Sequence, residues 1–388
     1  MTRRVIRVLV VFLNTGGGHR SAADATAEAL RDLYGDRVRV DVVDVTREYF
    51  SWPVSKLDEM YEWLIRMRAW PWAIVYHLTD GARRFGLVGR GVGWLTGRSI
   101  GHLLAEHPAE LVVCCHPLLR APLARGLRRA GKGRGLITLV TDLASGHAAW
   151  FVPPGERWVV ATEGTRGRAA AMGIPTECIE VSGLPVRRCF VNGARRDPVA
   201  ARRRLGLDPD SPVVLLMGGA MGTGPLLQLV RAMANSGLWA ELVVITGRNK
   251  SVYEKLNSYK WSLPVHVAGF VSNLHEWMEA ADILVTKAGP GTLSEALVMG
   301  LPMVLCGALP GQERPNVDYV VANGAGVWAP TPAEAAERVQ ELLERDRSSL
   351  MRMEERARIL AQPDAARRAA RVIWGAAEEC SLDGSSVI

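Results

Sequence analysis

The sequence predicts an α/β protein built from two doubly wound parallel sheets, each in a Rossmann-like domain. Short, continuous apolar runs alternate with helical segments along the chain, which is typical of strands buried on both faces of a parallel sheet. The alternation restarts near residue 212, and a glycine-rich turn follows the first strand of each series. At 388 residues, 48% of them hydrophobic, the chain is long enough for two such domains.

The first series supplies six of the expected strands. The first apolar run passes into glycines without a small-residue cleavage site, so we expect a strand there and not a secretory leader. An alanine-rich helix is expected from about residue 21 to residue 33. The strands are expected at residues 5–13, 38–45, 111–115, 136–140, 158–161 and 179–181.

The second series follows a charged segment, residues 182–204, in which we expect the hinge between the domains. Its strands are expected at residues 212–217, 242–245, 265–268, 283–285 and 303–305. The predicted organisation is therefore an N-terminal domain (1–183), a C-terminal domain (184–362) and a last segment (363–388).

The cysteines and the apolar runs exclude several classes of protein. Six cysteines occur without a CxxC spacing, and Cys114 and Cys115 continue an apolar run. We therefore expect reduced core thiols, with no disulfide framework and no zinc site. No apolar stretch reaches the length of a spanning helix, so we expect no membrane crossing.

The positive charge is concentrated in residues 50–134, which hold 13 Lys and Arg against 6 Asp and Glu. The same region carries five tryptophans: Trp52, Trp63, Trp70, Trp72 and Trp94. Indole rings settle at lipid headgroups and arginines meet lipid phosphates, so the region fits a peripheral membrane contact. The arginines expected there are Arg66, Arg68, Arg83 and Arg84.

Two other interpretations of this region stay open from composition. A basic patch also suits nucleic acid, but no helix-turn-helix, zinc or RNA-binding aromatic motif accompanies it, so we expect no nucleic-acid partner. Alternatively, the tryptophans are core residues with a solvated arginine rim.

Two loops of the second series predict a nucleotide-sugar site. Gly289-Pro290-Gly291-Thr292 follows an apolar strand and opens a helix, an arrangement that presents backbone N–H groups to a phosphate. Glu295, one turn into that helix, could accept hydrogen bonds from a ribose diol. Gln312 and Glu313, with Asn316 downstream, follow the next strand, at the edge where open parallel sheets bind ligands.

The first series offers a candidate general base. His19 lies at the expected start of a helix, directly after Gly17 and Gly18, whose missing side chains leave the imidazole open to a substrate. The glycines lack the third, spaced glycine of GxGxxG. A dehydrogenase with Asp44 as ribose ligand is therefore only weakly supported.

Together these blocks resemble the monogalactosyldiacylglycerol synthases and the related processive diacylglycerol glucosyltransferases, inverting GT-B glycosyltransferases of family 28. The matching blocks span roughly residues 8–320. They are Thr15–Ala23, Thr141-Asp142-Leu143 with His147 and Trp150, Gly183–Arg187 with Phe190, Met217–Pro225, Gly247–Lys250, Gly269-Phe270-Val271, and the two loops above. The peptidoglycan lipid-carrier N-acetylglucosaminyltransferase shares the fold but is less similar.

The resemblance implies roles for individual residues. The pyrophosphate would lie against Gly218, Gly219, Gly222 and Gly224, with Arg187 supplying a cation from the hinge. Phe270 and Val271 would frame the uracil, and Arg248 would also belong to the nucleotide-sugar site. Glu295 would hold the ribose, and Gln312 and Glu313 would contact the hexose. His19 would be the base or sit beside it, and Asp142 is the best candidate to orient or assist it.

The same resemblance implies the reaction: transfer of a hexose from a UDP-sugar to the 3-hydroxyl of diacylglycerol, with inversion. It implies no metal or other cofactor, and we interpret Asp208-Pro209-Asp210 as a turn. The protein would be peripheral at the cytoplasmic face of a membrane, with residues 363–388 packing back on the N-terminal domain. UDP-galactose is favoured as the donor, with UDP-glucose left open. The alternatives are a peptidoglycan-type transferase and a nucleotide-sugar binding protein or epimerase on the same scaffold.

Overall fold

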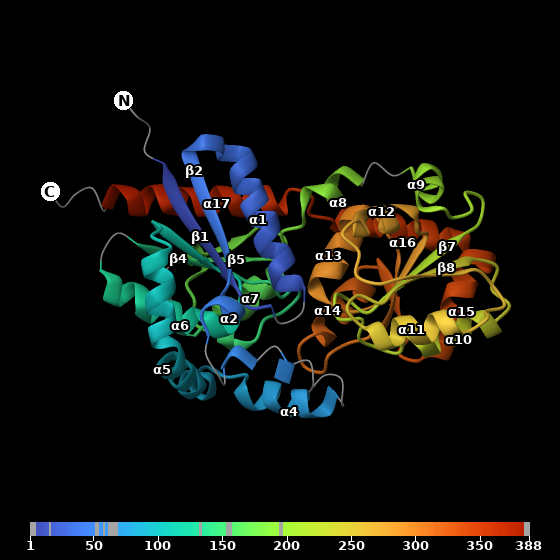
Figure 1. Cartoon of the computed structure of the whole chain (residues 1–388), viewed down its shortest axis with the longest axis horizontal. Helices are drawn as coiled ribbons and strands as arrows, with labels where there is room; N and C mark the ends of the chain where they lie inside the picture. Colours follow the sequence, from blue (N-terminus) through green and yellow to red (C-terminus); the bar gives the residue numbers. More distant parts are fainter. Residues whose placement is uncertain are drawn as a thin grey trace. The chain divides into compact units, whose positions relative to one another are not determined.

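The computed structural model describes residues 5–14, 17–50, 54–56, 59–60, 69–131, 134–152, 157–193 and 197–383. The chain divides into two compact units, each a parallel sheet flanked by helices (Figure 1). Unit 1 comprises Met1–Arg188, Pro310–Gln312 and Asp364–Ile388, and unit 2 comprises Cys189–Leu309 and Glu313–Pro363.

Unit 1 contains a six-stranded sheet of order β2-β1-β3-β4-β5-β6, with every neighbouring pair parallel. Its strands are β1 (Ile6–Phe12), β2 (Val38–Asp44), β3 (Leu111–Cys114), β4 (Gly135–Leu139), β5 (Arg157–Val160) and β6 (Ile179–Val181). Its helices of six residues or more are α1 (Gly18–Tyr34), α4 (Ala69–Thr79), α5 (Ala82–Glu106), α6 (Pro117–Ala130), α7 (Glu163–Ala171) and α17 (Ala365–Asp383). Its short helices include α2 (Val45–Glu48) and the 3₁₀ turn η3 (Ala148–Trp150).

Both faces of the unit 1 sheet are buried, because alternate residues of a strand point to opposite faces. Val8 and Val10 of β1 pack in a core with α1 and α17, whereas Leu9 and Val11 pack in a second core with α5 and α6. Helices on both faces explain why the central strands β3 and β4 are buried along their whole length.

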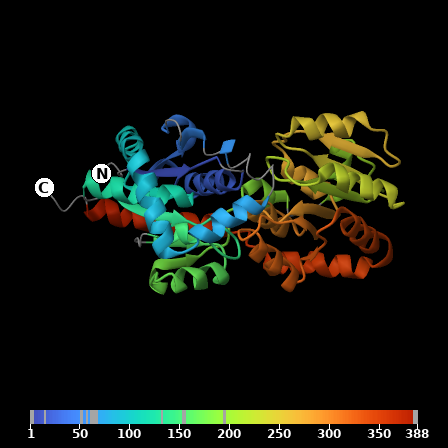
Figure 2. The same ribbon diagram turned by 90° about the horizontal axis from the view of Figure 1, so that it is seen from below.

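The last helix, α17, returns to the N-terminal unit, as the sequence predicted. It runs along unit 1 in red in Figures 1 and 2. Trp374 stacks on Tyr34 of α1 with ring centroids 4.1 Å apart, and the Arg37 guanidinium lies 4.9 Å from the Trp374 ring. Ile373 and Ala369 enter the same core as Val8 and Val10.

Unit 2 repeats the architecture with a parallel sheet of order β12-β11-β10-β7-β8-β9. The strands are β7 (Val213–Met217), β8 (Glu241–Ile245), β9 (Val265–Ala268), β10 (Ile283–Lys287), β11 (Met303–Gly307) and β12 (Gly326–Trp328). The helices are α8 (Arg188–Gly193), α9 (Pro198–Leu205), α10 (Leu226–Asn235), α11 (Lys250–Ser258), α12 (Leu274–Ala280), α13 (Pro290–Met299), α14 (Arg314–Ala322), α15 (Pro332–Gln340), the π-helical turn η5 (Glu341–Arg345) and α16 (Arg347–Leu360).

The prediction of two Rossmann-like parallel sheets is confirmed, and the predicted strands agree with the observed ones to within about two residues at each end. The edge strand β12 was not predicted. The helix expected from residue 21 begins earlier, at Gly18, so His19 lies in its first turn.

Each sheet has one point at which the strand order reverses direction. In unit 1 it lies between β1 and β3, and in unit 2 between β7 and β10. Doubly wound sheets bind ligands outside the carboxyl ends of the strands at this switch point. We therefore expect ligand-binding and catalytic residues directly after β1, β3, β7 and β10.

Two further predictions can be compared with the structure. All six cysteines are free thiols, as expected. Among the described residues, the helices are all too short or too polar to cross a bilayer.

Candidate active site

His19 lies at the switch point of unit 1, in the first turn of α1. Its Nδ1 is in hydrogen-bond contact with Oγ1 of Thr141 at 2.6 Å. Burial lowers the pKa of His19 to about 4, and a hydrogen bond with the Cys115 backbone opposes this shift only in part. The imidazole is therefore neutral at physiological pH and can accept a proton.

His116 shares this switch point and was missed by sequence reasoning. It directly follows the β3 run, and its ring packs edge-on against His19 with centroids 4.6 Å apart. Its Nδ1 accepts a hydrogen bond from the Leu118 N–H, so its proton sits on Nε2. Burial, followed by the neighbouring His19, holds the pKa of His116 well below its usual range. The strand-end rule applied above to Gln312 and Glu313 also points to residue 116, but only the strand order, with β3 beside β1, places this residue against His19.

Asp142 follows β4 and is 8% exposed. Its Oδ2 accepts a hydrogen bond from Nε1 of the buried Trp150 at 2.7 Å, and the Trp150 ring lies 6.1 Å from the His19 ring. The side chain of Thr141 contacts His19, whereas that of Asp142 is held by Trp150. The catalytic role predicted for Asp142 stays a prediction.

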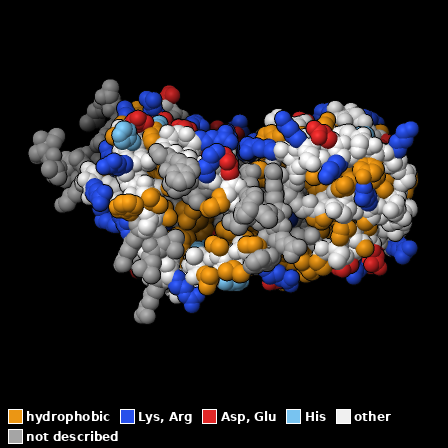
Figure 3. All heavy atoms as spheres, turned by 60° about the horizontal axis from the view of Figure 1, so that its bottom comes forward, with side chains coloured by type: hydrophobic (Ala, Val, Ile, Leu, Met, Phe, Trp, Pro, Cys, Tyr) orange, Lys and Arg blue, Asp and Glu red, His pale blue; other side chains and the backbone are white. Residues whose placement is uncertain are grey.

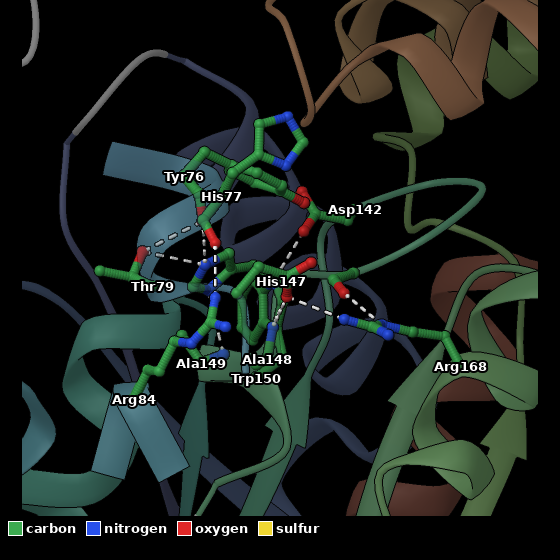
Figure 4. A network of polar contacts seen from close by, with 12 residues as sticks. Tyr76, His77, Thr79, Arg84, Asp142, His147, Ala148, Ala149, Trp150 and Arg168 are labelled. Atoms are coloured by element: carbon green, nitrogen blue, oxygen red, sulfur yellow. Dashed lines mark hydrogen bonds and ion pairs between the residues drawn. The ribbon is translucent and has the colours of Figure 1, made fainter. Parts of the chain in front are cut away.

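Tyr76 of α4 extends towards Asp142 (Figure 4). Burial, with the charges of Asp142 and Asp80 added, raises the pKa of the Tyr76 phenol well above its usual range. The phenol therefore keeps its proton and is available as a hydrogen-bond donor beside the carboxylate.

His147 has a structural place in this network (Figure 4). Its Nδ1 accepts from the Ala149 N–H at 3.1 Å, and its Nε2 lies 3.3 Å from the Tyr76 carbonyl and 3.2 Å from Thr79 Oγ1. Asp80 strengthens the attachment by accepting from the Ala148 N–H and from Arg168. These contacts fasten the end of α4 to the loop that carries Asp142 and Trp150.

The residues proposed for membrane contact are described only in part. Trp63, Arg66 and Arg68 lie outside the described residues, as does Trp52, and the side chains of Arg83 and Trp70 are not described either. Arg84 is exposed and donates to the His77 carbonyl at 3.4 Å. Gly17 caps α1, and a Cβ on Gly18 would meet no atom within 4 Å.

An apolar surface nevertheless lies on this part of unit 1. Ile74, Val75 and Leu78 are exposed on α4, and Trp94 and Leu95 on α5. Hydrophobic side chains gather on the face that Figure 3 brings forward, which carries α4. Trp94 is 83% exposed, so the interpretation of these tryptophans as core residues is wrong for that position.

Several glycines in the loop after β7 are required by the packing and backbone conformation of the loop itself. A Cβ on Gly218 would lie 1.9 Å from the Thr223 carbonyl oxygen, and one on Gly222 would lie 1.9 Å from the Thr246 carbonyl oxygen. Gly219 and Gly224 have φ of 70° and 97°, in the region that favours glycine. The Asn249 amide donates to the Gly222 carbonyl and fixes the turn.

The second loop opens α13 at the neighbouring switch-point strand. Gly289 is the N-cap and Pro290 the first helical residue, followed by Gly291 and Thr292. Glu295 is buried in the second turn, and Asn316 supports the loop by donating to the Ala288 carbonyl at 3.0 Å.

The Gln312 and Glu313 side chains differ in their surroundings. Glu313 is buried; its Oε1 accepts from Lys287 Nζ at 2.6 Å, and its Oε2 accepts from the Leu309 N–H at 2.9 Å. Gln312 Oε1 is buried without a hydrogen-bond partner in the described part of the chain, an arrangement that a ligand hydroxyl would satisfy.

The other predicted donor-site residues lie as follows. The Arg248 guanidinium sits 5.4 Å from the ring of Phe270, which is 61% exposed, and Val271 follows it. The Arg187 charge lowers the pKa of Asp24 on α1, against the larger effect of burial, which raises it. Asp208 accepts from the Asp210 N–H and from Ser211, which confirms that this segment is a turn. The described residues contain no cluster of three His, Cys, Asp or Glu suited to a metal.

Each unit thus gathers a set of candidate site residues. Unit 1 brings His19 together with Thr141, His116 and the Asp142–Trp150 pair at the carboxyl edge of β1, β3 and β4. Unit 2 brings the glycine loop, the Gly-Pro-Gly turn and Glu313 to the ends of β7, β10 and β11. Lys287, at the end of β10, joins them and was not predicted.

Two family models match the chain. The model described as "Monogalactosyldiacylglycerol (MGDG) synthase" matches residues 19–186, and that described as "Glycosyltransferase family 28 C-terminal domain" matches residues 213–372. Monogalactosyldiacylglycerol synthase 2, chloroplastic, of Arabidopsis thaliana is 34% identical over 93% of this chain and 79% of its own length. The synthase of Spinacia oleracea is 36% identical over 92% of this chain and 70% of its own length.

Solved structures share the fold at low identity. MurG of Acinetobacter baumannii superposes with a TM-score of 0.60 at 16% identity, covering 95% of this chain and 99% of its own. A variant of Os79 from O. sativa in complex with UDP superposes with a TM-score of 0.63 at 16% identity, covering 96% of this chain and 100% of its own. UDP-GlcNAc 2-epimerase from Neisseria meningitidis, bound to UDP-GlcNAc, superposes with a TM-score of 0.61 at 14% identity, covering 96% of this chain and 100% of its own. The two glycosyltransferase neighbours fit the predicted GT-B fold.

Proposed function

The chain belongs to the monogalactosyldiacylglycerol synthase family of glycosyltransferases, and from that premise we propose that it transfers a hexose from a UDP-sugar to the 3-hydroxyl of 1,2-diacylglycerol. UDP-galactose is the favoured donor, in keeping with the names of these relatives. The observation that carries the proposal is a neutral, buried histidine at the switch point of unit 1, hydrogen-bonded to Thr141.

The reaction is a single displacement with inversion. The acceptor oxygen attacks the anomeric carbon, the bond from that carbon to the diphosphate breaks, and its electrons leave with UDP. His19 takes the hydroxyl proton, and its contact with Thr141 fixes the ring. His116 holds its proton on Nε2 beside the same ring and adds no charge to the site.

Most of the residues proposed to bind the donor belong to unit 2, whereas Arg187 and Gln312 belong to unit 1. Backbone N–H groups of the Gly218–Gly224 loop and the start of α13 suit the diphosphate, with Arg187 as a cation. Phe270 and Arg248 suit the uracil, Glu295 the ribose, and Gln312 the hexose through its unpartnered oxygen. With cationic and dipolar groups in these roles, we propose that transfer requires no metal.

We propose that the enzyme works as a peripheral protein on the cytoplasmic face of a membrane. The apolar side chains of Ile74, Val75, Leu78 and Trp94 would enter the headgroup boundary, with the arginines of residues 50–134 beside them. The hydrogen bonds from α4 to the Asp142 loop would then hold the acceptor site next to the lipid.

The test is a measurement of UDP release on anionic vesicles that contain diacylglycerol, an undecaprenyl carrier or neither, in EDTA. Competing UDP-galactose and UDP-glucose are supplied, and the glycolipid is identified by NMR. We expect β-linked hexosyl diacylglycerol from the first vesicles only. Transfer to the undecaprenyl carrier, epimerised sugar without transfer, or a strict need for magnesium or manganese would each overturn part of the proposal.

A further inference from the structure

Lys287 occupies the switch point of unit 2. It is the last residue of β10, whose neighbour on one side is β7, and the chain order reverses between these two strands. Ligands of doubly wound sheets lie outside the strand ends at this point. A lysine there carries a charge at the place where a ligand's phosphates are expected.

Glycines surround this side chain. A Cβ on Gly289 would lie 3.2 Å from Lys287 Nζ, and one on Gly219 would lie 3.6 Å from its Cε. Gly289 has an ordinary φ of −70°, so backbone conformation does not require a glycine there. Both turns that are expected to hold the diphosphate therefore leave room around the ammonium.

The Lys287 ammonium is paired with the Glu313 carboxylate, and that carboxylate also accepts a backbone hydrogen bond. Lys287 Nζ donates to Glu313 Oε1 at 2.6 Å, while Glu313 Oε2 is held by the Leu309 N–H. The Glu313 side chain is 3% exposed and that of Lys287 is 26% exposed. A buried carboxylate needs such a partner, and an ammonium has three N–H groups, so Lys287 can serve Glu313 and a further anion together.

We propose that Lys287 is a donor-binding residue that donates to the diphosphate of the UDP-sugar and positions Glu313 against the hexose. This inference rests on the function proposed above and names a cation for the leaving diphosphate within unit 2. As the bond to the anomeric carbon breaks, negative charge moves onto the diphosphate oxygens, and a fixed ammonium stabilises that charge. The same ammonium holds the Glu313 side chain in place through the contact with Oε1.

The test compares the two members of the ion pair by titration with UDP, UMP and uridine, without acceptor or metal. Lys287→Met should weaken UDP binding about tenfold or more, because a hydrogen bond to a charged group is lost, and leave uridine binding unchanged. Glu313→Gln should keep or increase UDP affinity, since the ammonium loses a competing anion, while kcat falls. Lys287→Arg should restore UDP affinity in part, and Lys255→Met, an exposed lysine of α11, should have no effect.

UDP affinity that falls in Lys287→Met but is kept or rises in Glu313→Gln separates this proposal from a merely structural ion pair. Equal losses of UDP affinity in Lys287→Met and Glu313→Gln, or UDP affinity in Lys287→Met equal to wild type, would overturn it. If Lys287→Met fails to fold, Glu313→Gln and Lys287→Arg still carry the comparison. Wild-type protein that binds no UDP would instead contradict the proposed function itself.

Discussion

At the scale of single residues, the two switch points carry different chemistry. Unit 1 places two neutral histidines there, whereas unit 2 places glycine turns and a lysine–glutamate pair. Burial removes the charge from His19 and His116, and the glycines of unit 2 open its backbone to an anion. We therefore propose that proton acceptance and phosphate binding take place at separate sheets.

His19→Ala should lower the rate of transfer at least a hundredfold, because general-base catalysis contributes about 10²–10⁴. UDP affinity should be unchanged, since His19 is not among the residues proposed to bind the donor. The measurement is kcat on diacylglycerol vesicles together with a UDP titration. His102→Ala, which removes an exposed histidine of α5, is the matched control. Equal loss of UDP binding in His19→Ala would contradict the assignment.

Gly222→Ala should destabilise unit 2 far more than Gly237→Ala. Both glycines have positive φ, of 58° and 77°, so each substitution costs about 1 kcal/mol of backbone strain. Only at Gly222 would the new Cβ meet the Thr246 carbonyl oxygen at 1.9 Å, whereas Gly237 has open space. Thermal unfolding of both variants is the measurement, and similar Tm values would show that the turn can relax.

Individual roles were harder to predict from sequence than strand positions. The apolar runs located the strands because burial on both faces leaves a continuous signal, and the glycine turns located the loops that follow β7 and β10. His116 and Lys287 were missed because their importance depends on strand order, which brings β3 beside β1 and β10 beside β7. Thr141 contacts His19 through its side chain, a role that the sequence did not predict for it.

At the scale of elements, α4 joins an apolar surface to the loop that carries Asp142 and Trp150. Its outer residues Ile74, Val75 and Leu78 are exposed, while Tyr76 and Thr79 turn inward to His147. The helix is therefore held by polar contacts on one side and offers a lipid-compatible surface on the other.

Replacing Ile74 and Leu78 together by Asp should weaken binding to anionic vesicles, because two apolar side chains no longer enter the lipid and two negative charges are added. Vesicle sedimentation is the measurement, with kcat on detergent-dispersed diacylglycerol as a check that the site is intact. Val199→Asp, on an exposed position of α9, is the control. Unchanged sedimentation of the double variant would remove α4 from the membrane contact.

At the scale of the whole molecule, pH should control stability through buried histidines. Burial lowers the folded-state pKa of His19, His116 and His147 below 6.5, the value of an ordinary histidine, so the unfolded chain binds more protons in acid. Their contribution is fully present above pH 6.5 and is lost as pH falls towards the folded-state pKa, about 4 for His19. For His19 alone this amounts to about 3 kcal/mol.

Urea unfolding of unit 1 between pH 7.5 and pH 4.5 should therefore show a steep fall in the free energy of unfolding. His19→Asn should flatten that fall, because the substituted side chain does not titrate. A pH dependence identical in the variant and the wild type would mean that His19 keeps an ordinary pKa in the folded protein.

The position of α17 has a consequence for the order in which the molecule is made. Residues 366–377 complete the core that β1 and α1 begin, so β1 waits for α17. A ribosome that has finished unit 2 still carries an unfinished unit 1, with Val8, Val10 and Leu30 lacking part of their cover. The elements of unit 2 all precede α17, whereas the core of unit 1 stays partly uncovered, and open to aggregation and to chaperones, until α17 has been made.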